Sequence, residues 1–246
     1  MSKKGKSALT RSRRGRLVVF EGIDASGKTT QVLLLLKYLR NPPAGGKIPF
    51  SHYSFPRYSE PWGKMIRRYL NGEFGNVNSV NPYLAAALYA GDRLMACPSI
   101  NVDLKAGKIV VCDRYIGSNI AHQAAKVESP ADAKTLAGKQ SRKSEFIEWV
   151  EKFEYKENKI PEEDLVILLS LPPAVSRKLM SKKKKDIHEK DKDYMAQVAK
   201  VFEQLAQDRK NWVRVDCVKG GKLQKPEEIH KEVLKILRTK KKFGTR

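Results

Sequence analysis

The sequence predicts an α/β fold, a doubly wound five-stranded parallel sheet flanked by helices on both faces. Five short apolar runs alternate with segments of helical pattern along the 246 residues. Most of these runs are continuously apolar, which is typical of parallel strands that are buried on both faces. Charged residues follow three of the runs directly, at the carboxyl ends of strands, where sheets of this kind bind ligands.

The first apolar run, 17–20, leads into residues 22–29, which fit the phosphate-loop pattern G-x-x-x-x-G-K-[ST] at every fixed position. A helical segment, 31–39, follows the loop. Glycines let backbone N–H groups approach phosphate oxygens, and the helix N-terminus adds partial positive charge. Lys28 can reach the β- and γ-phosphates, and the Thr29 hydroxyl can bind Mg²⁺. The residues expected to bind ATP are Gly22, Ile23, Asp24, Ala25, Ser26, Gly27, Lys28, Thr29 and Thr30.

The middle of the chain predicts two more strands and two helices. Residues 51–55 read as the second strand, and 63–71 as a helix that ends in a glycine-rich turn. An alanine-rich helix is expected over 81–97, ended or kinked by Pro98, because proline lacks the amide hydrogen that continues a helix. The apolar run 108–112 follows as the third strand.

The last third of the chain completes the alternation. Strands are expected over 164–171, which is closed by two prolines, and over 211–217. A polar insert is expected around 127–143 and a lysine-rich loop over 181–193. The remaining helices are expected over 117–126, 144–155, 174–180, 194–209 and 226–238.

Two charged residues end the third strand, and one acid lies inside the phosphate loop. Asp113 stands where a magnesium-binding aspartate is found in phosphate-loop enzymes, although an aspartate can also cap a strand–loop junction. The planar fork of Arg114 suits bidentate phosphate binding. Asp24 needs a cationic or hydroxyl partner beside a nucleotide, such as Mg²⁺, an arginine or a sugar. The candidate metal ligands are therefore Thr29, Asp113 and Asp24.

The net charge of +22 is concentrated in three acid-free segments, 1–16, 177–185 and 240–246. Basic runs suit nucleic acid, but solvated tails are the favoured interpretation of the two termini. We expect a basic disordered tail over 1–15, one phosphate-loop domain over 16–239 and a basic tail over 240–246.

Three widely spaced cysteines indicate neither a zinc site nor a disulfide framework, and they favour a reducing compartment. No apolar run is long enough to span a bilayer, so no membrane association is expected. A cytoplasmic location is expected, with the basic N-terminus leaving nuclear and organellar locations open.

The chain resembles the thymidylate kinases, nucleoside monophosphate kinases of the P-loop NTPase type, over roughly residues 15–240. Three features make the resemblance specific. They are the glutamate before the loop, the aspartate within it, and Arg114 followed by a serine–asparagine pair. The apolar run that begins at Asp164 also resembles the family's fourth strand. The segments that match in order are Phe20–Gln31, Phe55–Tyr58, Tyr89–Arg93, and Asp113–Tyr115 with Ser118 and Asn119.

The resemblance implies a role for each matching residue. Asp24 would lie near the sugar 3′-hydroxyl, Arg93 would bind the thymine edge, and Tyr89 would stack on the base, although a tyrosine on a helix can also be ordinary core. The residues implied to contact the acceptor are Arg57, Tyr58, Leu70, Tyr89, Asp92, Arg93, Arg114, Ser118, Asn119 and His122.

Two departures from the family's pattern alter these expectations. His122 stands where the family often has an aromatic residue that excludes ribose, which leaves discrimination between deoxyribose and ribose open. Ala25 stands where some members carry a loop arginine. A mobile lid over about 177–193 would then supply the catalytic cation, with Arg177 the leading candidate; a merely solvated lysine loop is the alternative.

The expected reaction is phosphoryl transfer from ATP·Mg²⁺ to dTMP, with Lys28, Asp24, Arg114 and Arg177 as catalytic residues. The resemblance also implies a homodimer. Two alternatives remain open: a kinase with another acceptor, such as dUMP, dGMP or a deoxynucleoside, and a basic NTPase that binds nucleic acid. The basic clusters lack interleaved aromatic residues, which disfavours the second alternative.

Overall fold

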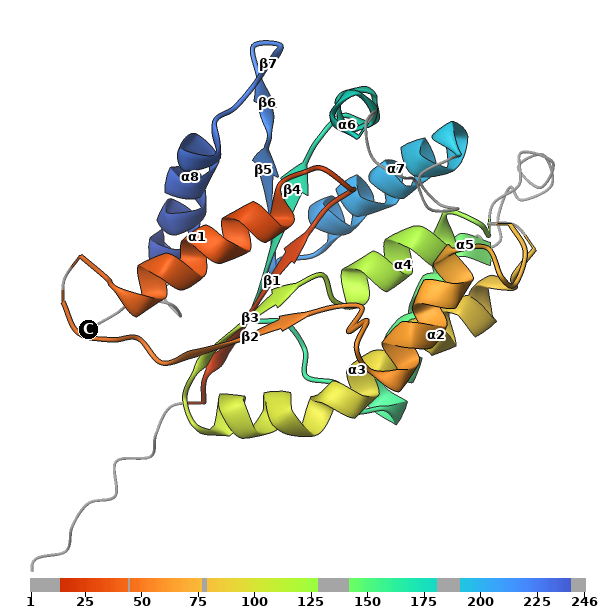
Figure 1. Ribbon diagram of the computed structural model, residues 1–246, viewed down its shortest axis with the longest axis horizontal. Coiled ribbons are helices and arrows are strands. Elements are labelled where there is room, and N and C mark those ends of the chain that lie inside the picture. Colours follow the sequence, from red (N-terminus) through yellow and green to blue (C-terminus); the bar gives the residue numbers. More distant parts are fainter. Residues whose placement is uncertain (1–13, 44, 77–78, 128–141, 181–190, 240–246) are drawn as a thin grey trace, which may run out of the picture.

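The computed structural model describes residues 14–43, 45–76, 79–127, 142–180 and 191–239 (Figure 1). One five-stranded sheet organises them, in the order β2-β3-β1-β4-β5, and every neighbouring pair is parallel. The strands are β1 (Arg16–Glu21), β2 (Phe50–Ser54), β3 (Ile109–Asp113), β4 (Leu165–Ser170) and β5 (Trp212–Asp216). The predicted doubly wound parallel sheet is confirmed, with strand bounds within one residue of those expected at most ends.

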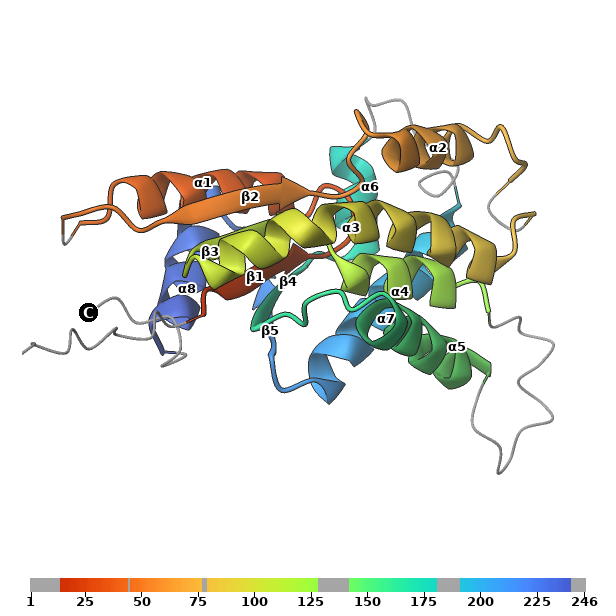
Figure 2. The same cartoon turned by 90° about the horizontal axis from the view of Figure 1, so that it is seen from below.

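Helices cover both faces of this sheet (Figures 1 and 2). On one face α1 packs against α8. On the other face α4 packs against both α3 and α7, and α3 and α7 contact the strands. Helix α2 lies against α3, and α5 against α4. The helices are α1 (Lys28–Arg40), α2 (Pro61–Leu70), α3 (Pro82–Lys105), α4 (Ile116–Ala124), α5 (Arg142–Glu151), α6 (Pro173–Leu179), α7 (Lys192–Asp208) and α8 (Pro226–Thr239).

The three central strands form the centre of the core. In β1 the side chains of residues 17–20 are fully buried, and in β4 every residue of 165–169 is at most 1% exposed. Val19 lies between Cys112 of β3 and Val166 of β4. Burial on both faces explains why these strands are continuously apolar, and each large side chain so buried stabilises the fold by about 1.5–3 kcal/mol.

Helix α3 corrects one expectation, because it continues through Pro98 and ends only at Lys105. Proline removes one helical hydrogen bond, which costs stability in isolation. Here Pro98 lies on the exposed side of the helix, where water can satisfy the carbonyl that loses its partner. Buried side chains on both sides of it, Ala90 and Ile100 among them, hold the two halves against the core.

Two local features were absent from the expectations. The helix expected over 144–155 ends as α5 at Glu151, and a π-helical segment, Lys152–Glu157, continues it. Strands β6 (Val218–Lys219) and β7 (Lys222–Leu223) form a small antiparallel hairpin. Gly220 and Gly221 have φ of 55° and 74° at its turn, which the Gly-Gly pair accommodates without strain.

The described residues also refine the chain ends. Gly15, expected in a disordered tail, donates from its amide to the carbonyl of Leu104 at 2.7 Å, and Arg14 pairs with Asp164 at 3.4 Å. The rest of the N-terminal tail, the C-terminal tail 240–246 and lid residues 181–190 lie outside the described residues.

All three cysteines are buried and unpaired (Cys97, Cys112 and Cys217). Within the described ranges, the helices are all too short or too polar to cross a bilayer.

Candidate active site

The phosphate loop joins β1 to α1 at the carboxyl end of the sheet. Gly22 has φ of 142°, and a Cβ there would lie 2.6 Å from the carbonyl oxygen of Leu169, so only glycine fits. Gly27 caps α1 with φ of 88°. Ala25 also adopts positive φ, at 60°, a conformation that costs a residue with a Cβ about 1–2 kcal/mol. The loop therefore holds a strained, phosphate-ready backbone.

Lys28 and Thr29, the first residues of α1, point to different partners. The Lys28 ammonium donates to the carbonyl oxygens of Gly22 and Ile23, both at 2.9 Å, so its side chain folds over its own loop. The Thr29 hydroxyl donates to Asp113 at 2.6 Å. Burial, reinforced by the nearby Arg114 charge, lowers the pKa of Lys28 to about 8. A bound polyanion would raise that pKa again.

Arg114 connects the phosphate loop with α4. It has φ of 65°, an uncommon conformation that a functional site can retain. Its guanidinium forms an ion pair with Asp24 and donates to Ser118 Oγ at 3.1 Å. Burial alone would raise the pKa of Asp24, but the charges of Arg114 and Lys28 hold it well below its usual range. Asp24 therefore stays ionised.

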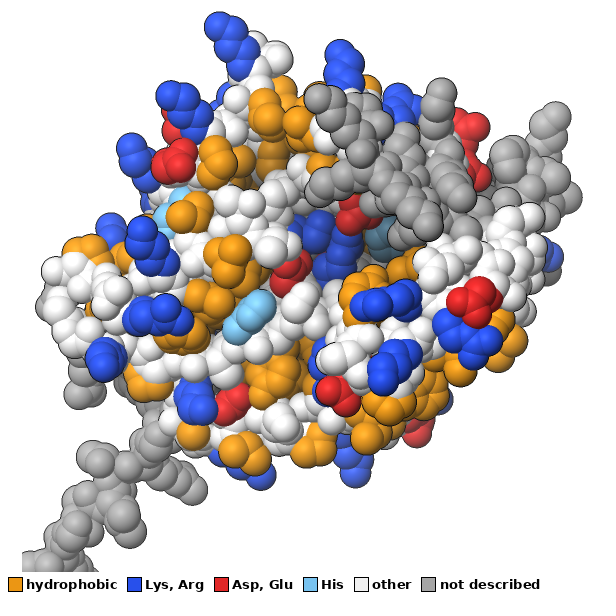
Figure 3. All heavy atoms as spheres, viewed as in Figure 1, with side chains coloured by type: hydrophobic (Ala, Val, Ile, Leu, Met, Phe, Trp, Pro, Cys, Tyr) orange, Lys and Arg blue, Asp and Glu red, His pale blue; other side chains and the backbone are white. Residues whose placement is uncertain are grey.

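A pocket with about 600 Å³ of empty volume opens beside this ion pair. Figure 3 shows Lys or Arg side chains in a hollow near the centre of the face that it draws. The pocket brings together Asp24, Tyr58, Leu70, Tyr89, Arg93, Arg114, Ser118, Asn119 and His122 from the expected residues, and adds Phe55, Pro56, Tyr115 and Gln123. Of the residues expected to contact the acceptor, Arg57 and Asp92 do not line it, and the expected lid residue Arg177 does not line it either.

Arg57 and Asp92 are instead paired with each other. The Asp92 carboxylate accepts from the Arg57 backbone amide at 2.8 Å and from Nε at 3.0 Å, and its carbonyl accepts from Nη2 at 2.8 Å. Asp92 is buried, while the Arg57 side chain is 22% exposed. Asp92 thus fixes the arginine rather than lining the pocket itself.

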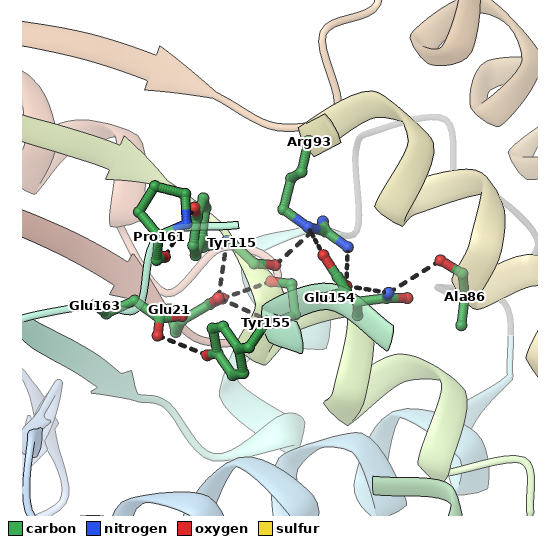
Figure 4. Close-up of polar contacts among 10 residues, drawn as sticks. Glu21, Ala86, Arg93, Tyr115, Glu154, Tyr155, Pro161 and Glu163 are labelled. Atoms are coloured by element: carbon green, nitrogen blue, oxygen red, sulfur yellow. Dashed lines mark hydrogen bonds and ion pairs between the residues drawn. The ribbon is translucent and has the colours of Figure 1, made fainter. Parts of the chain in front are cut away.

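Arg93 reaches the pocket from α3 with a buried counter-ion that the sequence did not indicate. Glu154 of the π-helical segment accepts from Arg93 Nε at 2.6 Å and from Nη2 at 2.5 Å (Figure 4). Both side chains are at most 2% exposed. Burial would lower the pKa of Arg93, but the Glu154 carboxylate outweighs it and raises that pKa above its ordinary value.

Gln123 is a pocket residue that the sequence reasoning missed. It is fully buried, and neither its amide oxygen nor its amide nitrogen has a hydrogen-bond partner among the described residues. Asn119 Oδ1, one helical turn earlier, is likewise buried without a partner in this part of the chain. The spacing i, i+4 from Asn119 was the available signal, since it places both amides on one face of α4.

His122 is buried at the wall of the same pocket and contacts α7. Its Nδ1 lies 3.1 Å from the Tyr194 hydroxyl, which donates to the His122 carbonyl at 2.8 Å. Burial and the nearby Arg114 charge lower the pKa of His122 to about 3, so the ring is neutral. It presents a neutral polar ring to the pocket.

Glu21 holds the start of α4 from the end of β1. Its carboxylate accepts from the backbone amides of Tyr115 and Ser118, each at 2.9 Å, and from the Ser118 hydroxyl at 2.5 Å (Figure 4). The residue is fully buried, and burial raises its pKa. An acid at this position acts as a cap supplied by a neighbouring strand.

Of the expected lid, residues 177–179 belong to the end of α6 and residues 192–193 to the start of α7. The Ser176 hydroxyl of α6 donates to the Asp24 carbonyl at 2.7 Å, which ties α6 to the phosphate loop. Arg177 is partly exposed and lines a separate small cavity with Ile23 and Asp191. The lysine run 182–185 lies outside the described residues.

Comparisons with known proteins agree with this geometry. The family model described as thymidylate kinase matches residues 20–141. A probable thymidylate kinase of Methanocaldococcus jannaschii is 31% identical over 221 residues, covering 90% of this chain and 95% of the relative. The thymidylate kinase of Mycobacterium tuberculosis is 29% identical over 202 residues, covering 77% and 85%. A solved thymidylate kinase structure from Candida albicans superposes with a TM-score of 0.69 at 27% identity, covering 94% of each chain.

Proposed function

The chain belongs to the thymidylate kinase family, and from this premise we propose how its residues carry out the family's reaction. The enzyme transfers the γ-phosphoryl group of ATP to dTMP, which yields ADP and dTDP for dTTP synthesis. The acceptor phosphate oxygen is already a nucleophile, so no strong general base is required. Catalysis consists of positioning the two phosphates and neutralising the charge that develops between them.

The observation that best supports dTMP binding at this site is the set of buried polar groups in a pocket beside the phosphate loop. The keto edge of thymine would accept from Arg93, and its N3–H would donate to Asn119 Oδ1. Gln123 would supply the remaining amide contacts, and Tyr89 would stack on the ring with Leu70 beside it. A ligand that pairs these groups removes the cost of leaving them unsatisfied.

The phosphates would be bound at the boundary between the pocket and the loop. Residues 22–30 would bind the ATP phosphates, with the Lys28 ammonium turning from its loop carbonyls to the β- and γ-oxygens. Arg114, Arg57 and Tyr58 would surround the acceptor phosphate. Asp24, held ionised by Arg114, would accept from the sugar 3′-hydroxyl with Ser118 and His122 nearby.

The family's reaction uses a divalent metal ion, and we propose Mg²⁺. The Thr29 hydroxyl and the Asp113 carboxylate meet at 2.6 Å at the mouth of the phosphate loop. Hard oxygen ligands of this kind suit Mg²⁺, which would supply charge neutralisation across the β- and γ-phosphates. The third expected ligand, Asp24, is paired with Arg114 instead. Thr29 and Asp113 are therefore the favoured ligands of the metal ion.

We propose that the lid residues complete the site when ATP binds. Ala25 supplies no arginine inside the loop. Arg177 lies on α6 next to Ser176, whose hydroxyl contacts the Asp24 carbonyl. A short movement of α6 would bring Arg177 toward the triphosphate and exclude water. The domain would span residues 16–239, with the basic tails outside it.

A homodimer is proposed from the exposed apolar surface of α2 and α3. Leu84, Met95 and Val102 are 67%, 63% and 65% exposed, and Trp62 adds a large ring on α2. Apolar side chains grouped in this way on a surface favour association with a second copy. Sedimentation equilibrium would measure the state directly.

A cytoplasmic location is proposed from the three unpaired thiols, which suit a reducing compartment. Binding of nucleic acid is not part of the proposal, because the basic runs fall mainly in the tails and the lid.

The test is a panel of nucleoside monophosphates with ATP and Mg²⁺, in which turnover and the shift in unfolding temperature are measured together. We expect dTMP to give the highest kcat/KM and the largest shift. A clear preference for dGMP, or ATP hydrolysis that depends on added nucleic acid, would contradict the assignment.

A further inference from the structure

Glu154 is the one buried acid of the π-helical segment that reaches two pocket residues at once. Its Oε2 accepts from Arg93 Nε, and its Oε1 accepts from both Arg93 Nη2 at 2.5 Å and Asn119 Nδ2 at 2.8 Å. The side chain is fully buried and does not line the pocket itself. A π-helical turn is a rare feature that often marks a functional site. Here it places Glu154 behind Arg93 and Asn119, which line the pocket.

The contacts of Asn119 fix which way its amide points. Its nitrogen donates to the Ala86 carbonyl at 3.1 Å and to the Glu154 carboxylate (Figure 4). Both partners can only accept, so both amide hydrogens are used and the nitrogen cannot exchange places with the oxygen. Asn119 Oδ1 is left as a buried acceptor without a partner in the described structure.

The contacts of Arg93 fix the opposite polarity. Two of its five N–H groups are bound to Glu154, and a third points to the Tyr115 carbonyl at 3.4 Å. The remaining hydrogens of the guanidinium offer only donors to the pocket. Donors from Arg93 and an acceptor from Asn119 match a pyrimidine that has a 4-keto group and an N3–H. They oppose cytosine, which has a 4-amino group and an unprotonated N3.

We propose that Glu154 is the positioning residue that sets this donor–acceptor polarity, and that the enzyme rejects amino-pyrimidine nucleotides because of it. The inference rests on the proposed function and adds the origin of its base selectivity. The Glu154 carboxylate bonds to Arg93 and Asn119 and not to the residues proposed to bind the phosphates. Its loss therefore affects which base binds, and leaves the transfer step largely unchanged.

Glu154→Gln tests this directly. A glutamine offers one oxygen and one NH₂ group, so whichever way it turns, a donor faces Arg93, and in one orientation also Asn119. Asn119 is then free to flip and Arg93 to shift. We expect the Kd for dTMP to rise about 30-fold, the Kd for dCMP to stay within about threefold, and kcat at saturating dTMP to stay within about threefold.

Two further variants keep the test decisive. Glu154→Asp retains the charge, so it protects against unfolding from an uncompensated Arg93, and its shorter reach should give an intermediate selectivity. Glu163→Gln is the matched control: Glu163 is also a buried acid, and it accepts from the Tyr155 hydroxyl at 2.6 Å rather than from Arg93 or Asn119. Its ratio of dTMP to dCMP affinity should equal that of the wild type.

The outcomes separate the inference from the function beneath it. If the wild type turns over dTMP and folded Glu154 variants keep the wild-type ratio of affinities, the inference is overturned. It is equally overturned if dTMP and dCMP weaken in parallel, or if kcat falls while the affinities hold, because those are the marks of a purely structural role. If the wild type fails to turn over dTMP, the proposed function itself is wrong.

Discussion

The phosphate loop and the base end of the pocket, formed by Arg93 and Asn119, are adjacent but are held in opposite ways. In the loop, Lys28 bonds to carbonyls five and six residues away. At the base end, Arg93 bonds to Glu154, which is 61 residues away. The first arrangement is set by one continuous segment and the second by ion pairs between distant helices.

The difference teaches where each property of the enzyme is encoded. Phosphate binding depends on backbone geometry that any chain with the loop pattern reproduces. Base selectivity, as we propose, depends on the buried ion pair of Arg93 with Glu154, in which removal of one partner leaves an uncompensated charge. Arg114 belongs to both regions, since it pairs with Asp24 of the loop and contacts Ser118 of the pocket.

The largest effect is expected in the loop, from Lys28→Ala. Loss of one preorganised cation at a transferring phosphoryl group costs about 3 kcal/mol, so kcat/KM should fall at least about 100-fold in steady-state assays with dTMP and ATP. Lys37→Ala, an exposed lysine on the same helix, is the control and should be neutral. Retention of more than about a tenth of the wild-type rate would remove Lys28 from the catalytic set.

Arg114→Ala tests the residue that the two regions share. We expect kcat to fall about 30-fold, or roughly 2 kcal/mol, while the affinity for ATP measured by calorimetry stays close to the wild-type value. Arg114→Lys keeps the charge but loses the planar fork, and its activity should be intermediate. If ATP affinity collapsed selectively, Arg114 would belong to the donor side.

The pocket carries a stability cost that grows as the pH falls below about 7, through His122. Its pKa of about 3 lies below the value of about 6.5 for the unfolded chain, so the unfolded state binds the extra proton between those values. Stability should therefore fall as the pH drops below about 6.5. Between pH 7 and pH 5 the loss from this residue is about 2 kcal/mol.

His122→Phe should remove that part of the pH dependence. The measurement is the free energy of unfolding in urea at several pH values, for the variant and the wild type together. Glu163, whose pKa burial raises to about 7, contributes with the opposite sign, so only the difference between the two proteins isolates the histidine. A difference that does not change with pH would show that the ring is not held neutral.

The smallest effect is expected from Ala25→Gly in the loop. Glycine relieves about 1–2 kcal/mol at φ of 60°, but it also increases the entropy of the unfolded chain by about 0.4–1 kcal/mol. The net gain should be about 0.5 kcal/mol, measurable by urea unfolding. Ala25→Val, with a branched side chain at the same exposed position, should lose stability; a gain would mean that the loop relaxes freely.

The sequence predicted the sheet, the loop and most of the pocket, because these depend on patterns within short segments. Continuous apolar runs identified the strands, and residues 22–29 identified the phosphate site. Gln123 was missed although its spacing from Asn119 was visible. Helix α3 was expected to end or kink at Pro98, because helix propensity contains no information on the packing that holds both halves.

Glu154 and the π-helical turn could not be predicted in this way. No local pattern marks an acid whose partner lies 61 residues away, and a π-helical segment has the same composition as an ordinary helix. The same holds for Asp92, which was expected to contact the acceptor and instead fixes Arg57. Which polar residue pairs with which is a property of the packed chain.

The three buried cysteines can report local opening of the native protein. Cys97, Cys112 and Cys217 belong to helix α3, to β3 and to the segment after β5, and burial raises the pKa of each thiol. A thiol reagent therefore reacts only when the layer around a cysteine opens. Cys217 Sγ donates to the Ser26 carbonyl at 3.5 Å, directly behind the phosphate loop. Alkylation of this one thiol would slow when a triphosphate is bound. The alkylation rate of Cys217 would therefore measure occupancy of the phosphate loop without an added label.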